Sequence, residues 1–199
     1  MNFNTFEFLL VFLPVCLALF YTVPVSCRLL ILLIFSLIFY GYSGIVPLEL
    51  LLITIIWAYS LTFISSKRYK KSIFLITVSF PLIALWLFKY LNFTFSLLPD
   101  YINDIKDPFF LFFFKVSIPA GISFYTFQLL SYVIDVYDGS IQKEKNFVKF
   151  ATYISSFPQL IAGPIVRYKD MVSQLSLIAT QPKLNPDFAS GIKFLVFGI

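Results

Sequence analysis

The chain has 199 residues, of which 59% are hydrophobic and 13% are charged; its mean hydropathy is +0.88 and its formal net charge is +5. Soluble domains carry about 25% charged residues, because polar side chains have to cover their surface. The composition therefore excludes an ordinary soluble protein and predicts an all-α, polytopic transmembrane protein.

Uncharged stretches of about the length that a helix needs to cross a bilayer, roughly 20 residues, follow one another along the chain. They predict membrane spans at about 5–27, 29–48, 49–66, 72–90 and 108–136, the last broken at Pro119, and then a re-entrant segment at 150–166 and a truncated helix at 188–199. The first span contains Glu7 and no basic residue before it, whereas a signal peptide begins with a basic region. We interpret residues 1–199 as a single membrane domain with this span as its first helix.

Basic connections alternate along the chain with connections that are uncharged or acidic. Arg28, the stretch "KRYKK" at 67–71 and the lysines at 143–149 make every second connection basic, while 41–47 is uncharged and 91–107 is mainly acidic. Because Lys and Arg gather in cytoplasmic loops, this alternation predicts an N-terminus outside and basic loops inside. The same bias accounts for the net charge, and no basic stripe interleaved with aromatic residues points to nucleic-acid binding.

The stretch "FPQLIAGPIVRYKD" at 157–170 interrupts a hydrophobic run with residues that break or bend a helix. The residues that we single out in it are Pro158, Gln159, Gly163, Pro164 and Arg167. Proline and glycine free backbone polar groups, which at membrane depth are tolerated only where protein or water satisfies them. We therefore predict a re-entrant element near 153–166 that lines a cavity, and the alternative is an ordinary kinked helix.

A polar face is predicted on the segment "FQLLSYVID". Gln128, Ser131 and Asp135 are spaced three and four residues apart, which places them on one side of a helix. Polar groups at membrane depth are costly and tend to line interiors. Either these residues line a cavity, or Gln128 and Ser131 bond to neighbouring helices and Asp135 lies at the cytoplasmic end.

Familiar soluble-enzyme motifs are missing from the sequence. It contains neither a phosphate-binding loop nor a dinucleotide-binding fingerprint, and it contains no histidine at all, which excludes Ser-His-Asp and Cys-His catalysis within this chain. Cys16 and Cys27 lack the spacing of a metal site or a disulfide framework, so no metal site is predicted.

Two long blocks, "IPAGISFYTFQLLSYVIDVYDG" at 118–139 and "FVKFATYISSFPQLIAGPIVRYKD" at 147–170, resemble the membrane-bound O-acyltransferase family, specifically its alginate O-acetylase branch. The N-terminal stretch and "FKYLNF" at 88–93 also resemble that branch, so the similarity covers nearly the whole chain. Asp138 departs from it, because the branch usually has Arg before the glycine.

The resemblance implies a bacterial inner-membrane enzyme that transfers an acyl group, with acetyl-CoA as the donor, to a polysaccharide such as alginate outside the cytoplasm. It also implies extracytoplasmic acetyl-transfer proteins as partners and no bound cofactor. The catalytic residue of the family is a histidine downstream of the "GPIVRY" block, so we expect this chain to be the N-terminal portion of a longer enzyme, with an incomplete fold and no activity alone. By resemblance, the residues singled out at 158–167 shape the cytoplasmic approach to the reaction chamber, where Arg167 meets a donor phosphate; the alternative for Arg167 is a membrane anchor.

Two functions of other classes remain open from the sequence. A transporter or channel subunit also has broken helices and polar faces at membrane depth, although usually in paired halves. A non-catalytic membrane scaffold is favoured by the absence of histidine.

Overall fold

The computed structural model describes residues 3, 5–64, 69–97, 118–160, 163–181 and 193, and every regular element in these ranges is helical. The protein is an all-α membrane protein, as the composition predicts. The predicted segment 108–117 and, apart from Lys193, the predicted helix at 188–199 lie outside the described residues.

The N-terminal region forms two short apolar helices. A π-helical turn, Phe8–Phe12, leads into α1 (Leu13–Thr22), and a 3-10 turn, Val25–Cys27, leads into α2 (Arg28–Gly41). These helices end before the predicted spans at 5–27 and 29–48 do, because Pro24 is extended after α1 and residues 42–44 form a turn after α2. Gly44 makes this turn possible with a φ of 116°, which side chains disfavour.

The next two helices are long and apolar. These are α3 (Ile45–Ile64) and α4 (Lys70–Leu85), which continues through a π-helical turn, Trp86–Tyr90, into α5 (Leu91–Ser96). Among the described residues, Ile45–Ile64 and Lys70–Tyr90 are long and apolar enough to cross a membrane, each with a hydropathy of 1.9. The helix α3 begins four residues before the predicted 49 because Pro47 lies in its first turn, where the ring removes no helical hydrogen bond.

The C-terminal half contains α8 (Ile122–Asp138), α9 (Phe147–Ser155), α10 (Phe157–Leu160) and α11 (Tyr168–Thr180). Residues 118–121 are not helical, and Gly121 precedes α8 with a φ of 72°. The helix therefore starts just after Pro119, where the sequence predicts a break.

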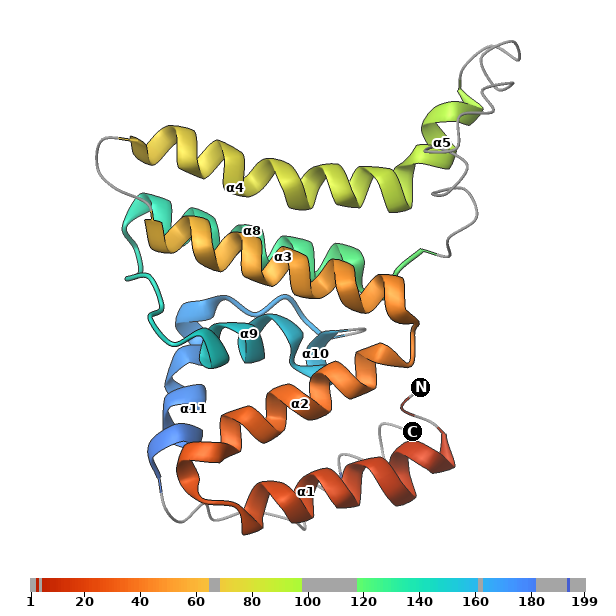
Figure 1. Cartoon of the computed structure of the whole chain (residues 1–199), viewed down its shortest axis with the longest axis vertical. Coiled ribbons are helices and arrows are strands. Elements are labelled where there is room, and N and C mark those ends of the chain that lie inside the picture. The colour runs from red at the N-terminus through yellow and green to blue at the C-terminus, as the bar shows by residue number, and fades with distance from the viewer. Residues whose placement is uncertain are drawn as a thin grey trace.

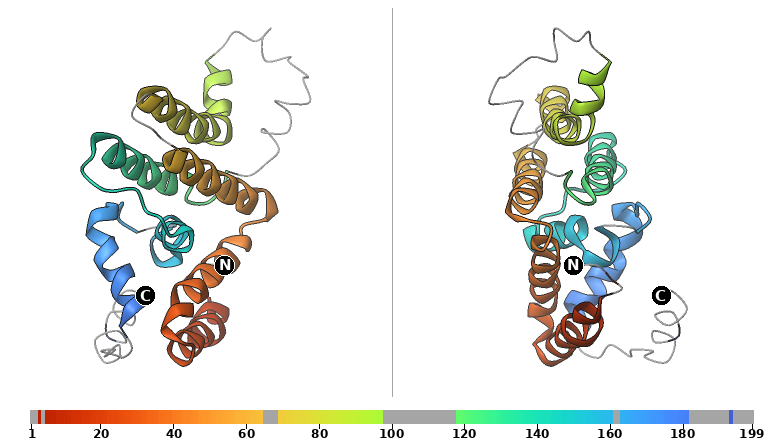
Figure 2. Two further views of the ribbon diagram at one scale, coloured as in Figure 1. Left: turned by 60° about the vertical axis from the view of Figure 1, so that its left-hand side comes forward. Right: turned by 90° about the vertical axis from the view of Figure 1, so that its right-hand side faces the viewer.

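Figure 1 shows the helices stacked in layers, with α4 above α3 and α8, and with α9 and α10 between this pair and α2. The helix α11 runs along one end of the stack, and α1 packs against α2 at the bottom, as the turned views also show (Figure 2). The core where α2, α3, α8 and α9 meet contains fully buried side chains, among them Tyr40, Leu51, Ile55, Tyr125, Leu129 and Ile154. A second cluster, made by Phe8, Phe12, Phe39 and Phe157, joins the N-terminal helices to α10.

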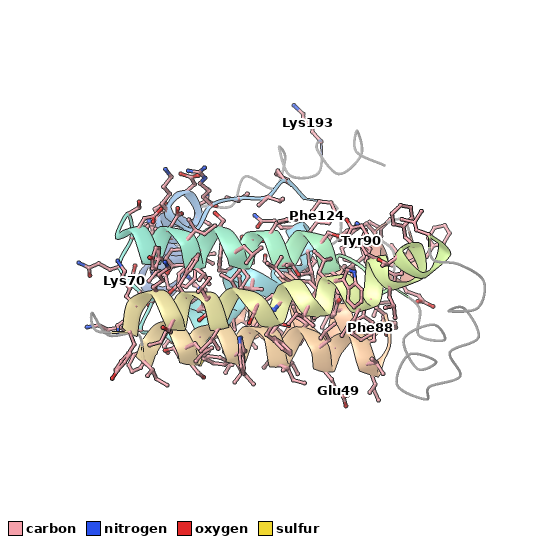
Figure 3. The ribbon with its side chains drawn as sticks, turned by 90° about the horizontal axis from the view of Figure 1, so that it is seen from above. Glu49, Lys70, Phe88, Tyr90, Phe124 and Lys193 are labelled. Carbon is pink, nitrogen blue, oxygen red and sulfur yellow. The ribbon has the colours of Figure 1, made fainter. Side chains whose placement is uncertain are left out.

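The basic connections gather at one end of the stack. The start of α2, the end of α3, the start of α4 and the connection from α8 to α9 lie at this end, whereas the connection from α2 to α3 lies at the other (Figure 1). Figure 3 shows Lys70 at the basic end of α4 and Tyr90 near its opposite end. The described basic segments therefore lie at one end of the stack, and the side of the membrane that this end faces stays a prediction.

Candidate functional site at the fold-back

The predicted re-entrant region begins with two short helices, α9 and α10, which Ser156 separates. Asn146 caps α9 by accepting a hydrogen bond from the Lys149 amide at 3.1 Å, and the chain leaves helical geometry at Ser156, whose ψ is 111°. Pro158 occupies the first turn of α10, where a proline is tolerated. With 9 residues α9 is about 14 Å long, which is too short to cross a bilayer.

From Gly163 the chain runs back beside α9 to the start of α11 (Figure 1). We call the described residues 147–160 and 163–167 the fold-back. The Tyr153 hydroxyl donates to the Val166 carbonyl at 2.9 Å, and Lys149 Nζ donates to Ser176 Oγ at 2.8 Å. The first bond joins the two arms of the fold-back, and the second joins α9 to α11. The two ends of the fold-back lie at the same end of the molecule (Figure 1), and a re-entrant path in the membrane stays a prediction.

Gly163 lies at the point where the fold-back reverses. Its amide donates to the Gln159 carbonyl at 3.0 Å, and a Cβ added to it would lie 2.5 Å from the Gln159 Cα. No side chain fits at that distance from backbone. The backbone of the turn therefore requires glycine here, which gives a structural reason for one of the residues singled out in the sequence.

The remaining residues singled out in the fold-back differ in burial. Gln159 is partly buried, and its Oε1 is buried without a hydrogen bond from any described residue. Pro158, Pro164 and Arg167 are exposed, and Arg167 is the residue that precedes α11. A role in lining a chamber stays a prediction for this set.

The predicted polar face of α8 is turned toward the fold-back at one position. Gln128 is buried, and its Nε2 donates to the Tyr153 carbonyl of α9 at 2.8 Å, which is the helix-to-helix contact that the sequence left as one alternative. Ser131 and Asp135 are partly buried. One carboxylate oxygen of Asp135, Oδ2, is buried and accepts no hydrogen bond from the described residues.

A cluster of three tyrosines lies where α8, α9 and α11 meet, and sequence reasoning missed it. The Tyr168 ring packs edge-on against the rings of Tyr132 and Tyr153, with centroids 5.1 and 5.0 Å apart. All three side chains are buried. Tyrosines are common at membrane interfaces, so nothing in the sequence distinguished these three from the other nine.

Glu144 joins this cluster to the loop between α8 and α9. The Tyr168 hydroxyl donates to its Oε2, Lys149 Nζ lies 3.3 Å from the same oxygen, and the Asn146 amide donates to Oε1 at 2.8 Å. The Glu144 amide in turn donates to the Tyr132 hydroxyl at 2.8 Å. Glu144 therefore ties α8, α9 and α11 together at the basic end.

These contacts favour the ionised carboxylate. Burial by itself raises the pKa of Glu144, but the hydrogen bonds from Tyr168 and Asn146 and the charge of Lys149 outweigh burial and lower that pKa. Burial and the hydrogen bond to Glu144 raise the pKa of Tyr168, so its hydroxyl keeps its proton at neutral pH. The Tyr168 hydroxyl is thus a donor to a permanent anion.

The arrangement of these residues suits a structural role, as a rigid wall of a site, better than a catalytic role. Among the residues that the structure describes, no three His, Cys, Asp or Glu side chains come together as metal ligands. The buried Asp135 oxygen lies at the basic end of α8, close to Tyr153. The site has no histidine to act as a base, because the chain contains none.

Comparison with known proteins gives O-acetylases and other acyltransferases as relatives. The chain is 36% identical to the probable alginate O-acetylase of Pseudomonas putida over 88% of this chain and 37% of the relative, and 36% identical to that of Pseudomonas aeruginosa over 88% and 35%. It is 27% identical to the peptidoglycan O-acetyltransferase of Helicobacter pylori over 86% of this chain and 38% of the relative.

The chain thus spans little more than a third of the length of these relatives. No family model matches it, and no solved structure matches it significantly. The similarity to the alginate O-acetylases nevertheless covers both motif blocks, because it extends over 88% of the chain. The comparisons thus show similarity over 88% of this chain to alginate O-acetylases, the branch of the membrane-bound O-acyltransferase family that the two motif blocks resemble.

Proposed function

We propose that this chain contributes to the transfer of acetyl groups to hydroxyls of a polysaccharide such as alginate outside the cytoplasm. The observation that supports this proposal is the similarity to alginate O-acetylases over 88% of the chain. In this proposal the donor is acetyl-CoA, the enzyme lies in the inner membrane of a bacterium, and extracytoplasmic acetyl-transfer proteins act with it.

The part assigned to these 199 residues is structural. The fold-back and the end of α8 form a wall of the reaction chamber on its cytoplasmic side, and Gly163 and the Glu144 contacts keep that wall in shape. The base that removes the proton of the acceptor hydroxyl comes from a histidine outside these residues, since they contain none. The same absence favours the second candidate function, a non-catalytic membrane scaffold.

Deletion of the gene that encodes this chain tests the proposal. We expect the extracellular polysaccharide of the deletion strain to lose its O-acetyl groups, measured by proton NMR of the purified polymer. Complementation with the intact gene should restore them, whereas an unchanged acetyl content in the deletion strain would contradict the proposed function. A transporter of the polymer would differ, because its loss reduces the amount of secreted polymer at unchanged acetylation.

We also propose that the basic end of the helix stack faces the cytoplasm, which thiol labelling tests. Single cysteines at Lys71, Lys145 and Lys169, which are exposed, are introduced in a chain whose Cys16 and Cys27 are replaced by serine. A membrane-impermeant maleimide should react with all three only from the cytoplasmic side, because a fold-back returns the chain to the side from which it enters. A cysteine at Asp104, in the acidic connection, should react only from outside. Opposite accessibility of positions 145 and 169 would mean that the segment between them crosses the membrane.

A further inference from the structure

A groove opens to solvent beside the fold-back, between the loop that follows α8 and the first turns of α11. Its volume is about 540 Å³, and it is lined by Ile141, Gln142, Lys143, Glu144, Lys145, Tyr168, Lys169 and Val172. The contacts described above use Glu144 and Tyr168 to hold the two sides of the groove together. The side chains of Lys145 and Lys169 on the rim of the groove take no part in these contacts. Lys143 donates a hydrogen bond to α3 instead.

The charge of the groove is positive. Three of its lining residues are lysines, and its one carboxylate, Glu144, already has both oxygens engaged by Lys149, Tyr168 and the Asn146 amide. The side chains of Lys145 and Lys169 are exposed. A group with negative charge that enters the groove therefore meets ammonium groups and no uncompensated carboxylate.

The groove lies at the level where α3 leaves its apolar segment. The Tyr59 hydroxyl of α3 donates to the Lys145 carbonyl at 2.6 Å, and Lys143 Nζ donates to the Phe63 carbonyl at 2.6 Å. Lys143 also lies over the Phe63 ring, 5.0 Å from its centroid. Tyr59 and Phe63 belong to the last turns of a helix that is long enough to cross the membrane, and aromatic residues there mark the headgroup region.

From this juxtaposition we propose that the groove lined by Lys143, Lys145 and Lys169 binds the phosphate headgroup of an anionic phospholipid. Basic pockets at the cytoplasmic ends of membrane helices have the charge and depth to hold such headgroups. The open side of the groove faces solvent at headgroup level, which a lipid of the adjoining leaflet reaches without leaving the membrane. This assignment goes beyond acetyl transfer and does not depend on it.

The experiment uses the purified 199-residue chain in detergent micelles and measures the lipid that it retains by native mass spectrometry. The probes are phosphatidylglycerol and phosphatidylcholine with the same acyl chains. We expect preferential retention of phosphatidylglycerol that weakens as salt is raised, because exposed charges are screened. The double variant Lys145→Gln/Lys169→Gln should bind phosphatidylglycerol roughly 25-fold more weakly, at about five-fold for each lysine near an anionic surface.

The matched control is Lys70→Gln/Lys71→Gln, which removes the same charge at the same end of the molecule but outside the groove. Its phosphatidylglycerol binding should equal that of the unaltered chain. The Lys145→Gln/Lys169→Gln variant should fold, since the hydrogen bond from Tyr59 goes to the backbone of Lys145 and survives the substitution. An unchanged unfolding midpoint checks the folding of both double variants.

Three results would overturn the assignment. The first is equal retention of the two lipids. The second is an equal loss in the control variant, which would mean a general surface-charge effect. The third is displacement of phosphatidylglycerol by inorganic pyrophosphate at millimolar concentration, which would make the groove a site for a soluble phosphate compound.

Discussion

Replacing Gly163 with alanine should destabilise the protein by about 2 to 3 kcal/mol, the upper part of the range for overpacking a tight site. The added Cβ would lie 2.5 Å from the Gln159 Cα and 2.9 Å from the Gln159 carbonyl oxygen, so the obstructing atoms belong to backbone. They cannot move aside as the tip of a flexible side chain does. The steric clash can be removed only if the turn itself opens, which breaks the hydrogen bond from the Gly163 amide to the Gln159 carbonyl. The midpoint of denaturant unfolding in detergent micelles measures the loss.

Gly41→Ala is the matched control, because it adds the same methyl group to the same residue type. At Gly41 the new Cβ would lie 3.6 Å from Leu48 Cδ2, which is an ordinary contact, and the residue ends α2. Alanine favours helix over glycine by up to about 1 kcal/mol, so this variant should be neutral or slightly stabilising. Equal midpoints for the two variants would show that the fold-back does not depend on the tight turn at Gly163.

The features that the sequence predicts well are those set by composition and by helix breakers. An apolar run of 20 residues with Glu49 as its one charged residue has few alternatives to a helix in a membrane, so α3 follows from its sequence. Pro158 and Gly163 indicate the turning back of the chain, because neither suits a continuous helix at those positions. The similarity to alginate O-acetylases also follows from sequence, since the two motif blocks are long and specific.

The features that the sequence does not predict depend on contacts between distant residues. Uncharged stretches overestimate the first two helices, because charge does not distinguish helix from turn at Tyr42 and Ser43. The packing of Tyr168 against Tyr132 and its bond to Glu144 join residues 24 to 36 positions apart, and local pattern carries no information about them. Gln128 shows the same limit, because its spacing indicates a face of α8 but not the Tyr153 carbonyl that it contacts.

The 199-residue chain alone should transfer no acetyl group, and this is the largest effect that we expect. Transfer to a hydroxyl needs a group that takes the acceptor's proton near neutral pH, and general acid-base help of this kind contributes about 10²- to 10⁴-fold. Histidine is the side chain whose ordinary pKa suits that task, and the chain contains none. Purified membranes that carry only this chain, supplied with radiolabelled acetyl donor and alginate, should give no labelled polymer above an empty-vector control.

Asp135 is the residue in the chain that could most directly contradict this expectation. Its Oδ2 is buried without a hydrogen bond from any described residue. However, it lies near the end of α8 where the basic loops gather, and in the proposed orientation the acceptor arrives from the opposite side (Figure 1). Reproducible transfer by the chain alone that Asp135→Asn abolishes would assign the chemistry to this carboxylate and remove the need for a histidine. A chain of the relatives' full length, assayed in parallel, should transfer acetyl groups and keep most of that activity with Asp135→Asn, because in the proposed arrangement the aspartate is a wall residue and the base is a histidine elsewhere.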